Sequence, residues 1–225
     1  MNKILNNYMT VLDKISKAKK NFVDTENQPK LVAVSKNFEE DVINILLKKG
    51  HTIFGENRVQ EAERKWTSLR NPFPQIELHL IGPLQSNKVK QALKVFDVIQ
   101  TLDREKIAKK FIDTILSSEN IDLAKKKFMI QVNTGNESQK SGISYNDVDG
   151  FYNYCTKEKK MNIVGLMAIP PNDNNTDKHF KTISELNASL NLKELSMGMS
   201  SDYKLAVKHK ATFLRIGSSI FGDRI

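Results

Sequence analysis

Strand-like and helix-like segments alternate along nearly the whole chain of 225 residues, and this alternation limits its possible folds more than any other feature. Short apolar runs predict buried strands, and apolar residues three or four positions apart predict helices. We expect eight strands, at 31–35, 52–54, 76–81, 97–100, 128–132, 163–169, 194–197 and 212–216. We expect helices between them at 42–47, 59–69, 87–95, 103–116, 145–157, 177–190 and 203–209. A further helix is expected before the first strand, because Ile4, Tyr8, Val11, Leu12 and Ile15 recur at helical spacing.

This order of elements predicts one α/β domain over residues 1–225, a single (β/α)8 TIM-type barrel with an extra N-terminal helix. A chain of this length can bury about 70% of its unfolded surface, which is enough for a proper core. The competing architecture is a doubly wound open sheet, because periodicity alone does not close a barrel. The number of strands and the lack of a glycine-rich dinucleotide motif favour the barrel.

Composition argues against several classes of protein. Lysine and arginine exceed aspartate and glutamate by nine, but the lysines are scattered over the predicted helices and no nucleic-acid-binding motif accompanies them. We therefore expect a solvated basic surface and no nucleic-acid partner. The lone cysteine, Cys155, lies on a predicted helix and is expected to be a buried structural thiol. We expect no metal site, no signal peptide, no membrane segment and a cytoplasmic location.

Lys36 directly follows a very apolar predicted strand, 31–35. In barrels of this type the active site lies at the carboxyl ends of the strands, so this side chain would begin inside the barrel mouth. A lysine in such a setting has a lowered pKa, and its neutral amine can attack an aldehyde to form a Schiff base. The alternative is a strand-end lysine whose stem packs on the barrel while its charge reaches solvent.

Two glycine- and serine-rich segments follow the last two strands, at 198–201 and 217–219. Loops in these positions form the usual phosphate site of the barrel fold. The alternative is a pair of ordinary turns, since Ser200, Ser201 and Asp202 are good helix caps. Together with Lys36, the two loops predict a phosphorylated aldehyde as ligand, and pyridoxal 5′-phosphate (PLP) is the obvious candidate.

Arg215, on the eighth predicted strand, is expected at the same mouth. It could bind the phosphate, or lie near the pyridine nitrogen and keep that nitrogen unprotonated, which weakens the ring as an electron sink. It could also form a surface ion pair with a helix carboxylate. His79 is expected to be a packed or hydrogen-bonded core histidine. Glu56 and Asp202 show no acidic partner in the sequence, so no carboxylate pair is predicted.

Seven motifs, in order from about residue 31 to the C-terminus, together resemble the pyridoxal phosphate homeostasis protein family. They lie at 31–36 (LVAVSK), 54–62 (FGENRVQEA), 79–88 (HLIGPLQSNK), 140–142 (KSG), 165–170 (GLMAIP), 195–200 (LSMGMS) and 215–222 (RIGSSIFG). The combination is far more specific than any single motif. Arg58 and Lys210 depart from the family pattern, where an aromatic residue and a glycine are common, and Ser218 replaces a frequent threonine. A positive φ is therefore expected at Lys210.

The resemblance implies a barrel like the N-terminal domain of alanine racemase, with PLP held as a Schiff base on Lys36. It also implies a set of further cofactor-binding residues: Asn57, Met199, Ser200, Arg215, Gly217 and Ser218. Lys140 lies in one of the motifs without an assigned role. No catalytic residue is predicted.

The resemblance further implies a carrier or buffer of PLP without robust catalysis, which supplies the cofactor to PLP-dependent apo-enzymes. We also expect a monomer. Because the sequence ends at Ile225, soon after its last predicted strand, we expect no second domain to provide a second base. Three other functions remain open. They are a PLP-dependent amino-acid racemase, a sugar-phosphate aldolase that uses Lys36, and a basic nucleic-acid-binding protein.

Overall fold

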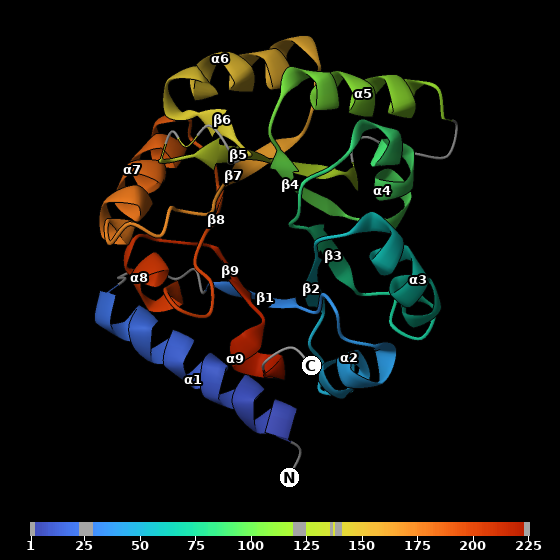
Figure 1. Ribbon diagram of the computed structural model, residues 1–225, viewed down its shortest axis with the longest axis vertical. Helices are drawn as coiled ribbons and strands as arrows, with labels where there is room; N and C mark the ends of the chain where they lie inside the picture. The colour runs from blue at the N-terminus through green and yellow to red at the C-terminus, as the bar shows by residue number, and fades with distance from the viewer. Residues whose placement is uncertain (1–2, 23–28, 119–124, 136, 138–140, 223–225) are drawn as a thin grey trace.

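Eight parallel strands close into a barrel in the computed structural model, which describes residues 3–22, 29–118, 125–135, 137 and 141–222 (Figure 1). The sheet order is β4-β3-β2-β1-β9-β8-β7-β5, and β4 pairs with β5 to complete the ring. The TIM-type barrel is thereby confirmed, and the open-sheet alternative is wrong. The strands are β1 (Lys30–Val34), β2 (Ile53–Glu56), β3 (Glu77–Leu80), β4 (Val98–Leu102), β5 (Lys127–Asn133), β7 (Ile163–Ala168), β8 (Glu194–Ser196) and β9 (Phe213–Ile216).

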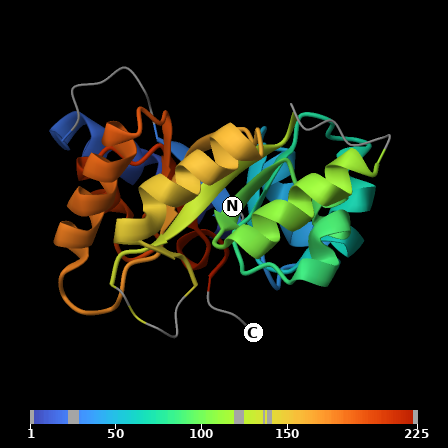
Figure 2. The same ribbon diagram turned by 90° about the horizontal axis from the view of Figure 1, so that it is seen from above.

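Helices cover the outside of the ring, and Figure 2 shows the strands crossing between them at a tilt. Their bounds are α1 (Lys3–Phe22), α2 (Glu40–Leu47), α3 (Val59–Arg70), α4 (Val89–Val95), α5 (Glu105–Leu116), α6 (Val148–Asn153), α7 (Thr176–Ser189), α8 (Tyr203–Lys208) and α9 (Ser218–Phe221). Most of these helices lie where the sequence predicts them. The expected helix at 145–157 is divided, since a 3-10 turn precedes α6 and a π-helical segment, Tyr154–Glu158, follows it.

Two short elements were not predicted from the sequence. The two-residue strand β6 (Ile143–Ser144) pairs with β5 beside the ring. The four-residue helix α9 follows the last barrel strand and begins at Ser218. Both are too short to carry a periodic pattern, so only their tertiary partners define them.

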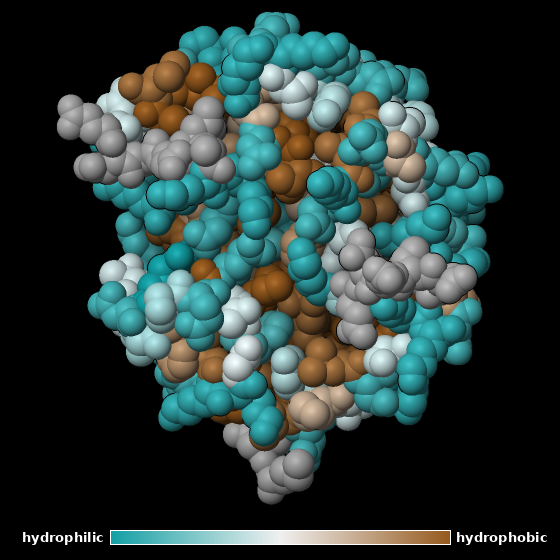
Figure 3. All heavy atoms as spheres, turned by 180° about the vertical axis from the view of Figure 1, so that it is seen from behind, coloured by the Kyte–Doolittle hydropathy of each residue, from teal (hydrophilic) through white to brown (hydrophobic). Residues whose placement is uncertain are grey.

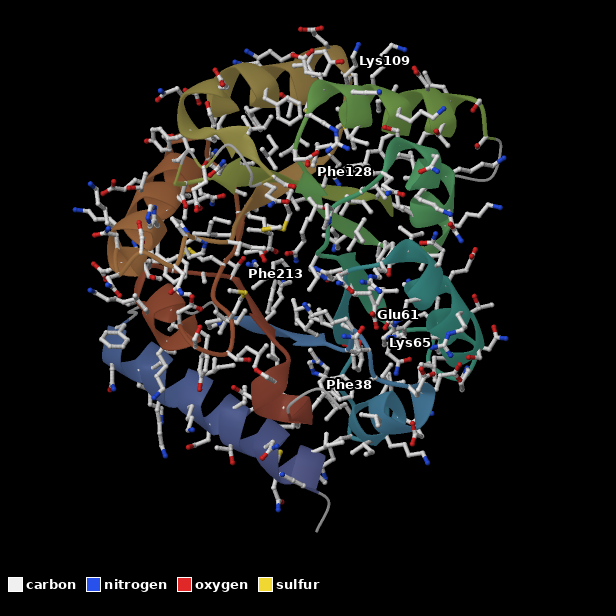
Figure 4. The ribbon with its side chains drawn as sticks, in the orientation of Figure 1. Phe38, Glu61, Lys65, Lys109, Phe128 and Phe213 are labelled. Atoms are coloured by element: carbon white, nitrogen blue, oxygen red, sulfur yellow. The ribbon has the colours of Figure 1, made fainter. Side chains whose placement is uncertain are left out.

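The core has two parts because alternate strand residues point inward and outward. A small apolar cluster contains Val32, Val98, Met129, Met167 and Phe213. Phe213 lies near the centre of the ring (Figure 4). Their outward-facing neighbours, such as Ala33 and Leu214, belong to a much larger cluster shared with the helices. Cys155 is fully buried there, and burial raises the pKa of its thiol to about 12.

The N-terminal helix α1 lies across the outside of α8 and α9 (Figure 1). Its amphipathic face buries Tyr8, Val11 and Ile15. The Asn7 amide donates a hydrogen bond of 3.1 Å to the carbonyl of Ile220 in α9. The predicted extra helix therefore packs against the layer of helices outside the barrel. Among the described helices, none has the length and apolarity that a membrane crossing requires.

The departure at Lys210 behaves as expected, because this residue has a φ of 63° in the turn before β9. Glycine adopts that conformation without steric cost, and lysine does so at some cost.

A buried histidine makes the stability of the fold depend on pH. His51 lies between α2 and β2, where its Nδ1 is 3.3 Å from the Tyr8 hydroxyl and its Nε2 is 2.8 Å from the carbonyl of Ile53. Burial lowers the pKa of His51 from 6.5 to about 4. As the pH falls, the unfolded chain therefore takes up this proton before the folded protein does.

We expect the free energy of unfolding to decrease between pH 6.5 and about pH 4, with His51 contributing up to about 3 kcal/mol of the loss. Above pH 6.5 His51 is neutral in both states, and this loss of stability is absent. Denaturant titrations across this range measure it, and His51→Phe should reduce the slope. Tyr8→Phe is the control, because it keeps the buried imidazole and should keep the slope. An unchanged slope in His51→Phe would contradict the assignment.

Candidate functional site

A cavity of about 370 Å³ opens at the carboxyl ends of the barrel strands. This volume is in the usual range for small-molecule sites. All seven predicted cofactor residues line it: Lys36, Asn57, Met199, Ser200, Arg215, Gly217 and Ser218. Apolar residues that the sequence reasoning missed complete the wall, namely Val34, Phe38, Ile81 and Ile169. Three of these lie at or just after inward-facing strand positions, which the two-residue alternation could have indicated.

Lys36 reaches the cavity because of its position relative to β1. Val32 belongs to the inner cluster, so Val34 and Lys36, two and four residues further on, continue on the inward face. Lys36 is half-buried. The next residue, Asn37, turns the chain away with a φ of 67°. The strand thus delivers the lysine to the barrel mouth and ends there.

Behind this segment lies a fully buried ion pair between Lys65 and Glu56, with 2.7 Å between Nζ and Oε1. Lys65 also contacts Glu61 at 2.8 Å, and Figure 4 shows these two side chains close together on α3. Its ammonium group donates to the carbonyls of Ser35 at 3.0 Å and Phe38 at 3.2 Å. The carbonyls on both sides of Lys36 are therefore held by one buried cation.

Glu56 is the acceptor on which this cluster centres. Its Oε1 also accepts hydrogen bonds from the Ser35 hydroxyl at 2.7 Å and the Trp66 indole at 3.2 Å. Burial raises the pKa of Glu56, and the charge of Lys65 opposes that shift. The sequence analysis did not predict these contacts, which form because α3 brings Lys65 and Trp66 against Glu56. Asp202 likewise has a partner, since it accepts the backbone N–H of Met199 at 2.6 Å.

The two predicted phosphate loops meet at the far side of the cavity. The backbone N–H of Ser219 donates to the Ser200 hydroxyl at 3.3 Å, which joins the loop after β8 to the start of α9. Gly198 begins the first loop with a φ of 86°, and a Cβ there would lie only 2.5 Å from the Ala206 side chain. Both the backbone conformation and the crowding thus require glycine at this position.

Arg215 projects into the barrel from β9 and is 4% exposed. Its Nη1 donates to the Ser196 hydroxyl at 2.7 Å, and its Nη2 to the carbonyl of Ala168 at 2.8 Å. Within the described part of the chain it forms no ion pair, so the surface-pair interpretation is wrong. Burial lowers the pKa of Arg215 to about 10, against the influence of Asp202, which leaves the group charged at neutral pH.

These features fit a phosphorylated aldehyde. Arg215 presents a buried charge held by neutral acceptors, which an anionic ligand can compensate. Asn57 contributes a buried side-chain oxygen that has no hydrogen-bond partner within the described structure. A ligand with a donor group would satisfy it. Lys36 provides an amine in the same cavity.

Other residues singled out in the sequence lie elsewhere. His79 is fully buried and hydrogen-bonded inside the barrel, which confirms it as a core histidine. Arg58 is exposed and lines a neighbouring hollow that shares Asn57 with the cavity. Lys140 lies outside the described residues. Within the described residues, no group of three His, Cys, Asp or Glu side chains could hold a metal ion.

Comparisons with known proteins identify the family of this chain. Residues 12–225 match the family model for the alanine racemase N-terminal domain. Proteins named pyridoxal phosphate homeostasis protein are 33% identical in Aquifex aeolicus and 35% identical in Haemophilus influenzae. These matches cover 95% of both chains in the first case, and 98% of this chain and 96% of the relative in the second. The chain belongs to the pyridoxal phosphate homeostasis protein family.

Solved structures extend the family relationship. PipY from Synechococcus elongatus, solved with PLP bound, superimposes with a TM-score of 0.78 at 30% identity. The match covers 93% of this chain and 99% of PipY. Alanine racemase from Clostridium difficile gives a TM-score of 0.69 at 14% identity, covering 97% of this chain but 56% of the racemase. The second likeness shows the shared barrel fold alone.

The ion pair behind Lys36 predicts a large loss of stability when one partner is removed. Lys65→Met leaves the Glu56 carboxylate buried without its cation and should lower the free energy of unfolding by about 3–5 kcal/mol. The double variant Lys65→Met/Glu56→Gln should recover part of this loss, because it removes the uncompensated charge. Denaturant titration measures both effects.

The matched control is Lys109→Met, which breaks the exposed pair of Lys109 with Asp113 on α5 and should change stability little. Equal effects of Lys65→Met and Lys109→Met would show that the buried pair has no special weight.

Proposed function

We propose that this chain binds PLP covalently through Lys36, and acts as a single barrel domain over residues 1–225 that carries or buffers PLP in the cytoplasm. The observation that carries the proposal is one cavity that combines the Lys36 amine, the buried Arg215 cation and the two serine-containing loops. The names of the relatives and the PLP bound in PipY support the same group.

Each residue has a definite task in this proposal. The neutral Lys36 amine would condense with the ligand aldehyde, replacing its C=O bond by a C=N bond and releasing the oxygen as water. Ser200, Gly217 and Ser218 hold the phosphate with hydroxyl and backbone donors. Arg215 and Asn57 orient the remainder of the ligand. When bound, the group supplies an electron-withdrawing ring conjugated to the carbon that is attached to the lysine.

The lining of the cavity favours carriage over catalysis. Among the described residues that line it, none is a histidine, tyrosine, cysteine or carboxylic acid. Proton abstraction from an amino-acid substrate needs a positioned acid or base besides the lysine. His79 does not serve, because it is buried and engaged within the barrel. We therefore propose weak or no turnover of amino acids. We further propose that the protein is a monomer and delivers PLP to apo-enzymes.

Attachment at Lys36 can be tested directly. Purified protein should turn yellow with PLP, and borohydride reduction followed by peptide mass spectrometry should find the phosphopyridoxyl group on Lys36. Lys36→Ala should abolish the visible band and the label. Lys88→Ala removes a lysine from the neighbouring hollow and should leave both unchanged. A protein that stays colourless and unlabelled would favour the sugar-phosphate alternative.

The absence of robust catalysis is tested with the PLP-loaded protein. When it is incubated with L-alanine in D2O, the α-proton should exchange no faster than it does with free PLP, as followed by proton NMR. Rapid exchange that is lost in Lys36→Ala would favour the racemase alternative. Transfer of PLP to an apo-enzyme in the presence of a free-PLP trap tests the carrier role, and complete inhibition by the trap would exclude direct hand-over.

A further inference from the structure

A continuous series of hydrogen bonds crosses the interior of the barrel and ends at Arg215. The Arg215 guanidinium contacts the Ser196 hydroxyl at 2.7 Å, and that hydroxyl donates to Gln100 Oε1 at 2.7 Å. Gln100 Nε2 lies 2.7 Å from His79 Nδ1, and His79 Nε2 lies 3.0 Å from a Glu77 carboxylate oxygen. These residues come from β9, β8, β4 and β3, so the series connects opposite sides of the ring.

The donors and acceptors fix the direction of the series. Arginine can only donate, so the Ser196 hydroxyl accepts a hydrogen bond from Arg215 and donates its own hydrogen bond to the Gln100 oxygen. The Gln100 amide nitrogen must then donate to His79 Nδ1, which leaves the histidine proton on Nε2 and directed at Glu77. A doubly protonated His79 would require the Gln100 amide to turn around. The Ser196 hydroxyl would then lose its acceptor.

The far end of the series is anchored by charge. Glu77 accepts a hydrogen bond from Lys127 at 2.8 Å, and its contact with His79 is the main cause that lowers the pKa of Glu77 to about 2. Lys127 and Phe213 line a hollow at the end of the barrel where the strands begin. Figure 3 shows apolar atoms gathered in the hollowed centre of the face turned away in Figure 1. With its pKa at about 2, the Glu77 carboxylate stays ionised and remains an acceptor for the Nε2–H of His79.

The members of the series have no room to rearrange. Ser196, Gln100 and His79 are fully buried, and the His79 ring packs edge-on against Phe213 with 5.0 Å between ring centroids. The second terminal nitrogen of Arg215 is held by the carbonyl of Ala168. A long arginine side chain loses much rotamer freedom in such a site. Because these contacts already restrict Arg215 without a ligand, this entropy cost does not fall on ligand binding.

We propose that Ser196, Gln100 and His79 are positioning residues that hold Arg215 in its place in the cavity. The same hydrogen bonds fix His79 in its neutral form, with the proton on Nε2. The proposal rests on the proposed function, because it assigns Arg215 to the bound PLP. None of the three residues lines the cavity, so their effect reaches the ligand through Arg215 alone.

The histidine form is tested first, on protein without PLP. Nitrogen-15 NMR at neutral pH should show His79 with a protonated Nε2 and an unprotonated Nδ1, and His79→Gln identifies the signal. Gln100→Glu should convert His79 to the doubly protonated form, because a carboxylate accepts a hydrogen bond from Nδ1–H and cannot donate one. A protonated Nδ1 in the unaltered protein, or an unchanged His79 in Gln100→Glu, would overturn the proposed direction.

The effect on the ligand is tested with Ser196→Ala. Loss of this acceptor should weaken PLP binding about tenfold in an absorbance titration, and should shift the visible band of the bound cofactor. Thr114→Val removes a buried hydroxyl on α5, remote from the series, and should change neither quantity. Unchanged affinity and band in Ser196→Ala, or equal changes in both variants, would overturn the positioning role.

Failure of this inference is distinguishable from failure of the proposed function. Borohydride labelling of Lys36 should persist in Ser196→Ala at saturating PLP, because the lysine is untouched. Absence of the label from the unaltered protein would contradict PLP attachment itself, whereas the NMR result on His79 does not depend on PLP. If Ser196→Ala fails to fold, Gln100→Leu, which removes the acceptor of the Ser196 hydroxyl, replaces it in the affinity and band measurements, and the same weakening and band shift are expected.

Discussion

The pairing of the first barrel strand, β1, with the last, β9, is the contact on which the rest of the structure depends. It closes eight parallel strands into a ring, so that every strand ends at the same mouth. Residues as far apart in the chain as Lys36, Asn57, Met199 and Arg215 then line one cavity. An open sheet with the same strands would place its first and last strands apart, and the lysine and the arginine would not meet.

Two buried cations support this mouth in different ways. Lys65 lies between the barrel and α3, where carboxylates neutralise its charge and its donated hydrogen bonds hold the segment around Lys36. Arg215 lies inside the ring, where only neutral oxygens hold it. The first arrangement uses its charge for structure. In the second, the hydrogen bonds of Arg215 within the described residues go to neutral oxygens, so an anionic ligand can compensate its charge.

The relationship to alanine racemase illustrates how one fold serves different chemistry. In this chain the barrel brings Lys36 and the two serine-containing loops to one mouth. Proton transfer to and from a substrate needs further groups at that mouth, and in the described part of this chain the cavity contains none besides the lysine. Under the proposed function, the local lining of the cavity, and not the fold, distinguishes a carrier of the cofactor from an enzyme that uses it.

The sequence by itself determined the number of barrel strands, the amphipathic N-terminal helix and the places of Lys36 and the two glycine- and serine-rich segments, because these follow from short-range periodicity and from the ends of predicted strands. Asn57 and Met199 were assigned to the cavity only through the resemblance to a known family. The sequence did not determine β6 or α9, which are too short for a periodic signal. It also missed the Lys65–Glu56 pair and the series from Glu77 to Arg215. Those contacts join separate strands and helices, and only closure of the barrel brings their donors and acceptors within hydrogen-bonding distance.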